Sequence, residues 1–220
     1  MKKRYITIGV IILFVILIVA TVIIVRKNSS SNTTVAEETT TSVLDKEMNI
    51  HVDGWLKVKK VFEYNGKLAV VVENVSNSDV EYALLSAKAG EETFTFNMSV
   101  LLSGTEVIIV CNENKKIDAN VSFTGWNTEN IIYFEGKPSI NDDKIEVSFT
   151  NNSILVKNVS DKDVTSDIFI YYKEKIDGML NGNITHRVRV SGLKAGSQTY
   201  VNTKNVNGND CQLMFIEYDD

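Results

Sequence analysis

The stretch that decides the fold is residues 72–80, VENVSNSDV, which returns 84 positions later as VKNVSDKDV at residues 156–164. Six of the nine positions are identical. Further along, Ser103-Gly104 is echoed by Ser191-Gly192, at a spacing four residues longer. A shared motif followed by a shared turn favours two copies of one domain. Chance matching in a chain rich in Asn and Ser is the alternative.

The segments around both copies alternate apolar and polar residues, which is typical of half-buried β-strands. Dipeptides such as Asn65-Gly66 and Asp177-Gly178 separate them and favour tight turns. No long stretch after residue 25 has a helical period. In the first copy the predicted inward faces are Leu68, Val70 and Val72, then Phe94, Phe96, Met98 and Val100, then Val107, Ile109 and Cys111. In the second copy they are Ile168, Ile170 and Tyr172, then Ile184, His186, Val188 and Val190, then Leu213 and Phe215.

Short strands at regular spacing, with connections too short for helices, predict antiparallel β-sandwiches. The only proline, Pro138, lies between the last strand of the first copy and the first strand of the second. We therefore predict a mainly β chain with two tandem immunoglobulin-like sandwich domains, residues 46–137 and 138–220. Both are slightly small for that type of fold.

Residues 156–190, followed by SGLKAG at 191–196, carry a further pattern. It resembles the FxLYD-type immunoglobulin-like domains of Firmicute surface proteins, and the likeness is weaker in the first copy, where Ser103-Gly104-Thr105 replaces the longer turn. The aromatic strand Phe169-Ile170-Tyr171-Tyr172 lacks the family's Leu-Tyr-Asp order. The resemblance implies a fold and a place at the cell surface. It implies no catalytic residues, because that family has no agreed activity.

Residues 5–25, YITIGVIILFVILIVATVIIV, contain no charge. As a helix, about 21 residues reach roughly 31 Å, which matches the hydrocarbon core of a bilayer. Lys2, Lys3 and Arg4 precede the run, so residues 1–4 are a predicted cytoplasmic stub and the rest of the chain lies outside the cytoplasm. The lipid bilayer is therefore the first predicted partner. A cleaved signal peptide is the alternative, but the run is long for one and lacks a small-x-small site at its end.

Residues 26–45 are rich in Ser, Thr, Asn and Glu and predict a flexible linker. Five of the 23 basic residues flank the apolar run, so the remainder carries 18 basic against 28 acidic residues, a formal charge of about −10. Such a surface repels nucleic acid and tolerates cations and basic peptides. We expect no nucleic-acid partner.

A sortase-like cysteine transpeptidase is the one enzyme class that fits the outline, since an anchor precedes a β-rich body. Cys111 would be the nucleophile and His51 its base. However, the Thr-Leu-x-Thr-Cys motif of that class is missing, and no Arg follows Cys111 closely. We treat this reading as a minor alternative.

Other candidate sites are weaker. A lone His186 on an apolar strand predicts a core residue, and the acidic loops at 141–143 and 161–163 lack the ligand spacing of a calcium hand. We predict no catalytic, cofactor-binding or metal residues and no cofactor. Whether Cys111 and Cys211 are bonded stays open, as does whether Trp55 and Trp126 form an exposed binding face.

The predicted protein is a single-pass cell-membrane protein without catalytic activity. It would serve as an extracytoplasmic interaction or scaffolding module for an unknown protein partner. The alternative is a ligand-binding or sensing accessory subunit of a membrane transporter or secretion complex. That alternative requires a concave pocket between the domains with convergent polar groups.

Overall fold

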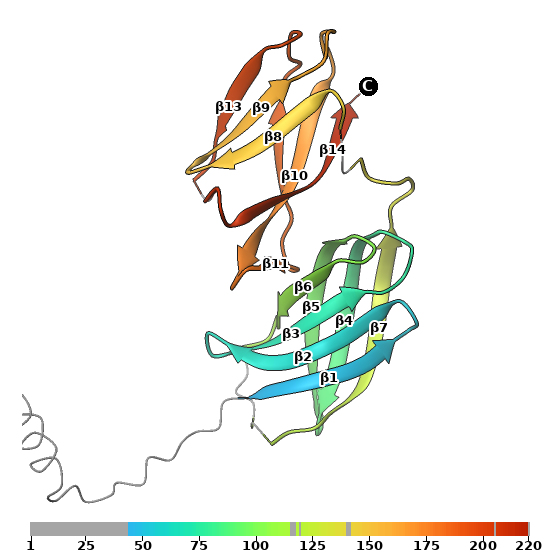
Figure 1. Ribbon diagram of the computed structural model, residues 1–220. Coiled ribbons are helices and arrows are strands. Elements are labelled where there is room, and N and C mark those ends of the chain that lie inside the picture. Colours follow the sequence, from blue (N-terminus) through green and yellow to red (C-terminus); the bar gives the residue numbers. More distant parts are fainter. Residues whose placement is uncertain (1–43, 115–117, 119, 140–141, 205, 220) are drawn as a thin grey trace, which may run out of the picture. The chain divides into compact units, whose positions relative to one another are not determined.

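The computed structural model describes residues 44–114, 118, 120–139, 142–204 and 206–219, and it is mainly β (Figure 1). The predicted membrane helix at 5–25 and all of the linker up to residue 43 lie outside the described residues. Within those ranges, nothing helical reaches the length and apolarity that a membrane crossing requires. The strands are β1 (Asp45–Val52), β2 (Leu56–Tyr64), β3 (Lys67–Asn74), β4 (Val80–Ala89), β5 (Glu92–Leu101), β6 (Glu106–Val110), β7 (Phe123–Tyr133), β8 (Ile145–Thr150), β9 (Ser153–Asn158), β10 (Asp167–Ile176), β11 (Met179–Asn181), β12 (His186–Val190), β13 (Gln198–Asn202) and β14 (Cys211–Asp219).

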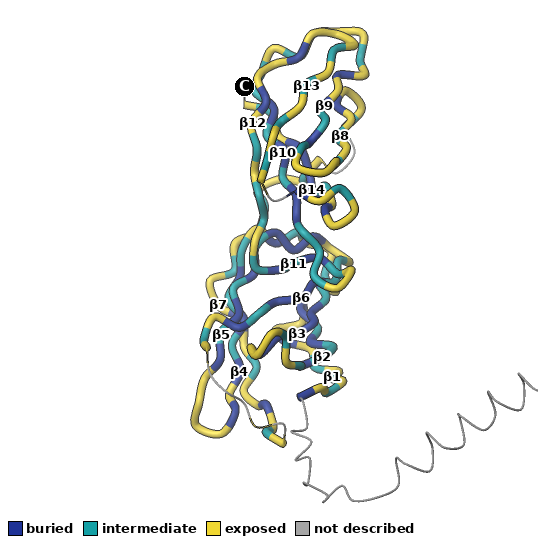
Figure 2. Tube along the Cα trace, turned by 90° about the vertical axis from the view of Figure 1, so that its left-hand side faces the viewer, coloured by how far each residue is buried: buried dark blue, intermediate teal, exposed yellow. Residues whose placement is uncertain are grey.

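The N-terminal half, residues 44–134, is sandwich-like. Strands β1-β2-β3-β6 form one layer and β5-β4-β7 form the other. Leu85 of β4 and Phe96 of β5 are fully buried against Val70 of β3 and Ile109 of β6. The inward faces of β3, β5 and β6 are those that the alternation predicts, and they form the dark interior in Figure 2.

The C-terminal half, residues 142–219, repeats this arrangement. Its layers are β8-β9-β13 and β12-β10-β14. They enclose a second core, in which Ile154 and Val156 of β9 pack with Ile168 and Ile170 of β10. The strand order matches β2-β3-β6 and β5-β4-β7 of the N-terminal half, so each strand of the C-terminal half except β11 has an equivalent.

The repeated nine-residue motif forms the same buried corner in each half. Asn74 is 0% exposed at the end of β3. Its Nδ2 donates to Ser78 O at 2.8 Å and to Leu101 O at 3.0 Å. Its Oδ1 accepts from Ser76 N at 3.0 Å and from Ser76 Oγ at 2.7 Å. One amide therefore joins the end of β3, the following turn and the end of β5.

Asn158 makes the equivalent bonds at the end of β9, and it is also 0% exposed. Its Nδ2 donates to Lys162 O at 2.8 Å and to Leu193 O at 3.0 Å. Its Oδ1 accepts from Ser160 N at 3.0 Å and Ser160 Oγ at 2.7 Å. The two copies agree bond by bond because a buried amide requires partners for both its donors and its acceptor.

The downstream turn pairs differently from the sequence expectation. Ser103-Gly104 corresponds to Ala195-Gly196, and not to Ser191-Gly192. The amides of Ser103 and Ala195 donate to Asp79 and Asp163, the matching acids of the two motifs, at 2.7 and 2.8 Å. Both glycines have positive φ, 72° and 67°. The second copy has extra residues before this turn. The identical dipeptide Ser191-Gly192 therefore lies upstream of the true equivalent, and the match predicted from the sequence was wrong.

A segment of the C-terminal half completes the N-terminal half. Strand β11 pairs in parallel with β6, and this pairing joins the first layer to β10 (Figure 1). Gly182 N donates to Ile108 O at 2.6 Å, and its carbonyl accepts from Ser99 N at 2.9 Å. The Asn183 side chain donates to Val110 O at 2.9 Å and accepts from Val110 N at 2.7 Å. Residues 179–185 thus fill the gap between β5 and β6, and we name them the bridging segment.

A buried lysine holds the bridging segment from the other side. Lys173 of β10 is 0% exposed. Its Nζ donates to Asn181 O at 2.8 Å, to Ile184 O at 3.2 Å, and at longer range to Ser99 Oγ and Gly182 O. Burial lowers the pKa of this ammonium to about 7, because the charged form loses its hydration. Two halves that the sequence treats as separate are therefore hydrogen-bonded together.

Two strand faces predicted from the sequence, one with Leu213 and Phe215 and one with Ile184, differ in the structure. Leu213 lies in the second core, whereas Phe215 lies in the first core, so they do not share a face. The reason is a register shift between β10 and β14, where Met214 is the extra residue. Ile184 is 51% exposed and belongs to the bridging segment instead of to β12.

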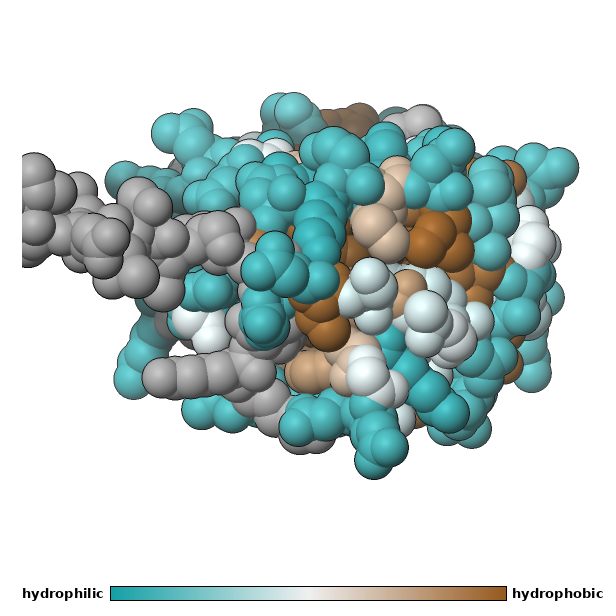
Figure 3. All heavy atoms as spheres, turned by 90° about the horizontal axis from the view of Figure 1, so that it is seen from below, coloured by the Kyte–Doolittle hydropathy of each residue, from teal (hydrophilic) through white to brown (hydrophobic). Residues whose placement is uncertain are grey.

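Large hydrophobic side chains that remain exposed are scattered over the described residues. They are Val75, Ile132, Tyr133, Val159, Ile184 and Tyr200. In the view from below, hydrophilic side chains surround separate hydrophobic patches (Figure 3). Single exposed hydrophobic residues are normal on protein surfaces.

Candidate functional site

The predicted cysteine nucleophile is in an unreactive environment. Cys111 is 3% exposed in the first core, and its Sγ donates to Glu113 Oε2 at 2.9 Å. Burial, together with this hydrogen bond, raises the pKa of the thiol to about 12. The thiolate is the nucleophilic form, so a thiol held protonated at neutral pH is a poor nucleophile.

The structure does not bring His51 to this thiol. In the strand register, His51 of β1 lies opposite Lys57 of β2, and Lys57 lies opposite Glu73 of β3. Glu73 in turn lies opposite Glu106 of β6. Cys111 lies five residues beyond Glu106 and three strands away from β1. Strand spacing and rise place the two side chains roughly 20 Å apart. His51 is therefore too far away to act as a base for Cys111.

The second cysteine and the second histidine lie in the C-terminal half. Cys111 and Cys211 are both free and buried, in different cores. His186 is half-buried and stacks on Tyr172, with ring centroids 5.0 Å apart, while its Nε2 lies 3.6 Å from Glu174. Across the ranges that the structure describes, no group of three or more His, Cys, Asp or Glu side chains could hold a metal ion.

The two tryptophans do not form an exposed face. Trp55 is 5% exposed, and its Nε1 donates to Thr128 Oγ1 at 3.1 Å. Trp126 is half-buried and packs on Phe123, with centroids 6.0 Å apart. Both side chains therefore belong to the packing of the N-terminal half.

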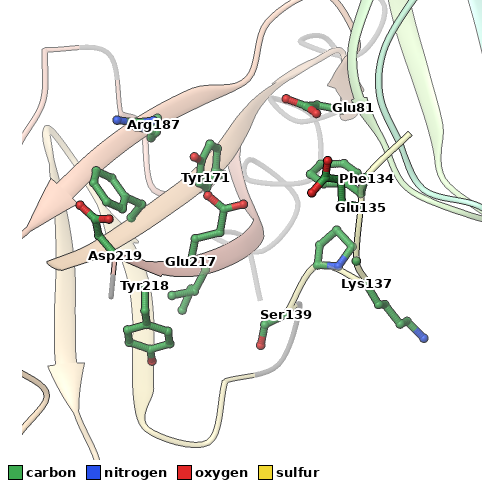
Figure 4. A pocket seen from close by; sticks show the side chains of 14 residues that line it. Glu81, Phe134, Glu135, Lys137, Ser139, Tyr171, Arg187, Glu217, Tyr218 and Asp219 are labelled. Carbon is green, nitrogen blue, oxygen red and sulfur yellow. The ribbon is translucent and has the colours of Figure 1, made fainter. Parts of the chain in front are cut away.

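A hollow of about 890 Å³ lies where the two halves meet, and it is the candidate site (Figure 4). We call it the junction groove. It is open to solvent, and five segments line it: β4, the connection after β7, and strands β10, β12 and β14. Its lining residues are Glu81, Phe134, Glu135, Gly136, Lys137, Pro138, Ser139, Phe169, Tyr171, Arg187, Ile216, Glu217, Tyr218 and Asp219.

Stacked aromatic rings support the groove. Tyr171 of β10 stacks on Phe215 of β14, with centroids 4.2 Å apart at 14°. Phe134 meets the same Phe215 ring edge-on at 5.3 Å. Since Phe134 comes from the N-terminal half, these rings tie both halves together beneath the groove. Offset and edge-on pairs each add about 0.5–1.5 kcal/mol beyond buried area.

Charged side chains stand above these rings. The Arg187 guanidinium lies 4.4 Å above the Phe169 ring and 6.0 Å from that of Tyr171. Burial, followed by the neighbouring Glu217 carboxylate, raises the pKa of the Tyr171 phenol. The Lys137 side chain extends away from the hollow (Figure 4). Charged residues from both halves therefore line one open, partly aromatic surface.

A scan against protein-family models gave no match, and a search of curated proteins gave no match either. The resemblance to FxLYD-type domains therefore depends on the residues quoted above.

Sequence reasoning did not single out the groove residues. Glu81 lies in the alternating strand β4, Phe134 directly follows β7, and Glu217 follows an apolar run in β14. Phe215 carried a signal in part, because its neighbours Met214 and Ile216 are also apolar and break the alternation. That break predicts a strand buried on both faces, but it does not tell which surface covers it.

Proposed function

We propose that this protein is a membrane-anchored, extracytoplasmic interaction or scaffolding protein without catalytic activity, and that its partner docks in the junction groove. In this proposal residues 5–25 cross the membrane, and two immunoglobulin-like sandwiches project from a linker. The single observation that carries the docking site is the groove, to which both halves contribute side chains.

The chemistry of the described residues supports a binding role. Cys111 is buried and protonated, and His51 is far from it. The junction groove offers aromatic rings and one guanidinium, which are groups enriched at protein–protein interfaces, and it also carries carboxylates. The hydrogen-bonded bridging segment makes the groove a preformed surface, which lowers the ordering cost of binding.

A second candidate function is the sensing or ligand-binding accessory subunit of a membrane transporter or secretion complex. The observation that favours it is the size of the hollow, about 890 Å³, which falls within the range of small-molecule sites. Such sites are usually enclosed and mostly apolar, whereas the junction groove is open and strongly charged. A polypeptide partner therefore fits better.

Photo-crosslinking in intact cells tests the docking site. A photoreactive residue replaces Glu135 in the groove of the full chain, and in a matched variant it replaces Glu146, an exposed residue of β8. We expect one discrete crosslinked product from the groove position and none from the β8 position. Equal products from both positions, or none from the groove, would overturn the proposal.

Protease protection tests the anchor. Protease added outside intact spheroplasts should digest the β-rich part of the full chain, while an epitope placed before Lys2 stays protected. Protection of both parts would contradict the proposed topology, and recovery of the chain from the medium would contradict the anchor.

A further inference from the structure

The two halves share one register in the turns that precede β6 and β13. Thr105 O accepts from Asn74 N at 3.0 Å, and Ser197 O accepts from Asn158 N at 2.9 Å. The hydroxyls of Thr105 and Ser197 each donate to the carbonyl three positions earlier, at 2.6 and 2.7 Å. Thr105 and Ser197, which are 92 positions apart, are therefore structural equivalents.

The same offset of 92 positions relates the strands that follow these turns. Ile108 of β6 corresponds to Tyr200 of β13, and Val110 corresponds to Asn202. The turn residues that bond to β3 and β9 lie three and five positions earlier. Because hydrogen bonds alternate along an antiparallel strand, the backbone groups of these four residues point away from β3 and β9, towards the open edge of each strand.

In the N-terminal half, the bridging segment takes up these outward groups. Gly182 N donates to Ile108 O at 2.6 Å, and the Asn183 side chain bonds to both N and O of Val110. From the other side, Ser99 N of β5 donates to Gly182 O at 2.9 Å. The segment thus lies between β5 and β6 and leaves Ile108 only 3% exposed.

The equivalent gap of the C-terminal half lies between β12 and β13, and none of the described residues covers it. In that part of the chain β13 is the last strand of its sheet (Figure 1). Tyr200 is 58% exposed, whereas its equivalent Ile108 is buried. Ser191, the equivalent of Ser99, is exposed as well. Backbone groups that are paired in one half therefore face solvent in the other.

The bridging segment shows what an occupant of this gap must provide. A Cβ on Gly182 would lie 2.7 Å from side-chain carbons of Val107 and Ile109. Their equivalents in β13, Thr199 and Val201, are β-branched too, so a glycine is required beside them as well. The residue after Gly182 is an Asn, whose amide can donate to a strand carbonyl and accept from a strand N–H at the same time.

We propose that the gap between β12 and β13 binds an extended segment of a partner protein, of the form apolar-x-Gly-Asn, which pairs in parallel with β13. In this complex Tyr200 O accepts from the glycine N–H, and the Asn side chain bonds to N and O of Asn202. The addition of a strand to an open sheet edge is a common mode of peptide recognition. This surface is separate from the junction groove and does not depend on the proposed function.

A second copy of this chain fits the gap less well than a partner protein. Two runs of the sequence have the form apolar-x-Gly-Asn, at 180–183 and 206–209. The first is held by β6 and by Lys173 of its own chain. In the second, a Cβ on Gly208 would lie 2.6 Å from Phe149 O, and Val206 is 3% exposed. Either run would have to leave its own core before it could pair with another copy.

Hydrogen–deuterium exchange of the full chain in neutral detergent tests the inference. The probe is a synthetic peptide with the sequence of residues 177–186, DGMLNGNITH. It is added at millimolar concentration, because a free peptide loses conformational entropy when it binds. We expect the fragment that contains β13 to exchange about threefold more slowly, since the Asn202 N–H becomes hydrogen-bonded. The fragment that contains β8, the other edge strand of the same sheet, should not change.

Matched variants of the peptide and of the chain localise the contact. In the peptide, Gly182→Val places a branched side chain against Thr199 and Val201 and should abolish the slowing, whereas Ile184→Val, at an exposed position of the bridging segment, should not. In the chain, Asn202→Pro removes the outward N–H and should abolish the slowing, whereas Asn202→Ala keeps it. Equal melting temperatures would show that both chain variants fold, and the two peptides decide the question if they do not.

Three results would overturn the inference: no slowing at β13, equal slowing at β8, or equal slowing by the Gly182→Val peptide. A dimer of the full chain that forms without peptide and is lost in Asn202→Pro would assign the gap to a second copy, and so would reject the partner protein. None of these measurements involves the junction groove, so their failure would leave the proposed docking site standing.

Discussion

Replacing Asn74 with Ala should destabilise the N-terminal half strongly, although the side chain is small. The amide makes four hydrogen bonds and is 0% exposed. Truncation leaves Leu101 O without this donor in a buried position, which costs about 1–3 kcal/mol. The three bonds to Ser76 and Ser78 are partly exposed, so water replaces them in part. We expect a total loss of about 2–4 kcal/mol in the free energy of unfolding.

The assay uses the only two tryptophans of the chain, Trp55 and Trp126, both of which lie in the N-terminal half. Their fluorescence during urea unfolding of the full chain in detergent reports on this half. The melting temperature should fall by about 4–16 °C. Asn77→Ala is the matched control, because it removes the same side chain from an exposed position of the same motif. Its cost should stay within about 0.5 kcal/mol.

Asn74→Asp tests the hydrogen-bond argument separately from packing, since the two side chains have nearly the same volume. At pH 7 a carboxylate oxygen of the introduced Asp would face the carbonyl oxygens of Ser78 and Leu101, and neither side could donate a hydrogen bond. The loss in the free energy of unfolding should therefore at least equal that of the Ala variant. These carbonyls raise the pKa of the introduced carboxyl in the folded state above its unfolded value of about 3.9. The folded state then binds the extra proton, so the penalty shrinks as pH falls towards 4.

The reasoning would be refuted if Asn74→Ala cost no more than Asn77→Ala, or if the penalty of Asn74→Asp did not depend on pH.

Asn158 allows the same test to be repeated in the C-terminal half. Its four bonds have the same lengths as those of Asn74, so Asn158→Ala should cost a similar amount. Because the two sites lie in different cores, their effects should add.

Three further predictions concern the junction and the thiols. The folded pKa of Lys173, about 7, lies below the unfolded value of 10.5, so the unfolded chain holds an extra proton between these pH values. Stability should therefore rise with pH by up to about 1.4 kcal/mol per unit above pH 7. Lys173→Met should lack this rise in denaturant titrations at several pH values, and an unchanged slope would contradict the assignment. A Cβ on Gly182 would lie 2.7 Å from side-chain carbons of Val107 and Ile109, so Gly182→Ala should cost about 1–3 kcal/mol in thermal unfolding. Gly136→Ala, which meets open space at an ordinary φ, should cost little, and equal effects would refute the packing argument. The buried Cys111 and Cys211 thiols should react with a maleimide at pH 7 only after unfolding, as mass spectrometry can measure, and rapid labelling of the native chain would disprove their burial.

Much of the local structure follows from neighbouring residues, and it could be predicted for that reason. Asn65-Gly66 and Asp177-Gly178 adopt positive φ angles, as the two-residue hairpins β2–β3 and β10–β11 require. The alternation in β3, β5 and β6 gives the correct inward faces, because a strand has a side-chain period of two. The equivalence of Ser103-Gly104 with Ala195-Gly196 could not be read this way, since it depends on hydrogen bonds to acids elsewhere in the chain.

The candidate site could not be predicted from the sequence, because it also depends on contacts between distant residues. Glu81 and Glu217 belong to strands of different halves, more than 130 positions apart. They line one groove because Phe134 packs on Phe215 and because the bridging segment pairs with β6. The local sequences of β4 and β14 do not indicate either of these contacts.

By itself the sequence determined a β-rich chain, its hairpin turns, and an Asn motif that occurs twice, because these depend on side-chain period, on φ preferences and on the needs of one buried amide. Only the tertiary structure decided that β11 joins β6, that Phe215 lies in the first core, and that Glu81 and Glu217 line one groove. The physical reason is that burial and charge pairing depend on which surfaces meet, and two halves built on one plan can meet in several ways. Side chains of the bridging segment and of Lys173 select one of them.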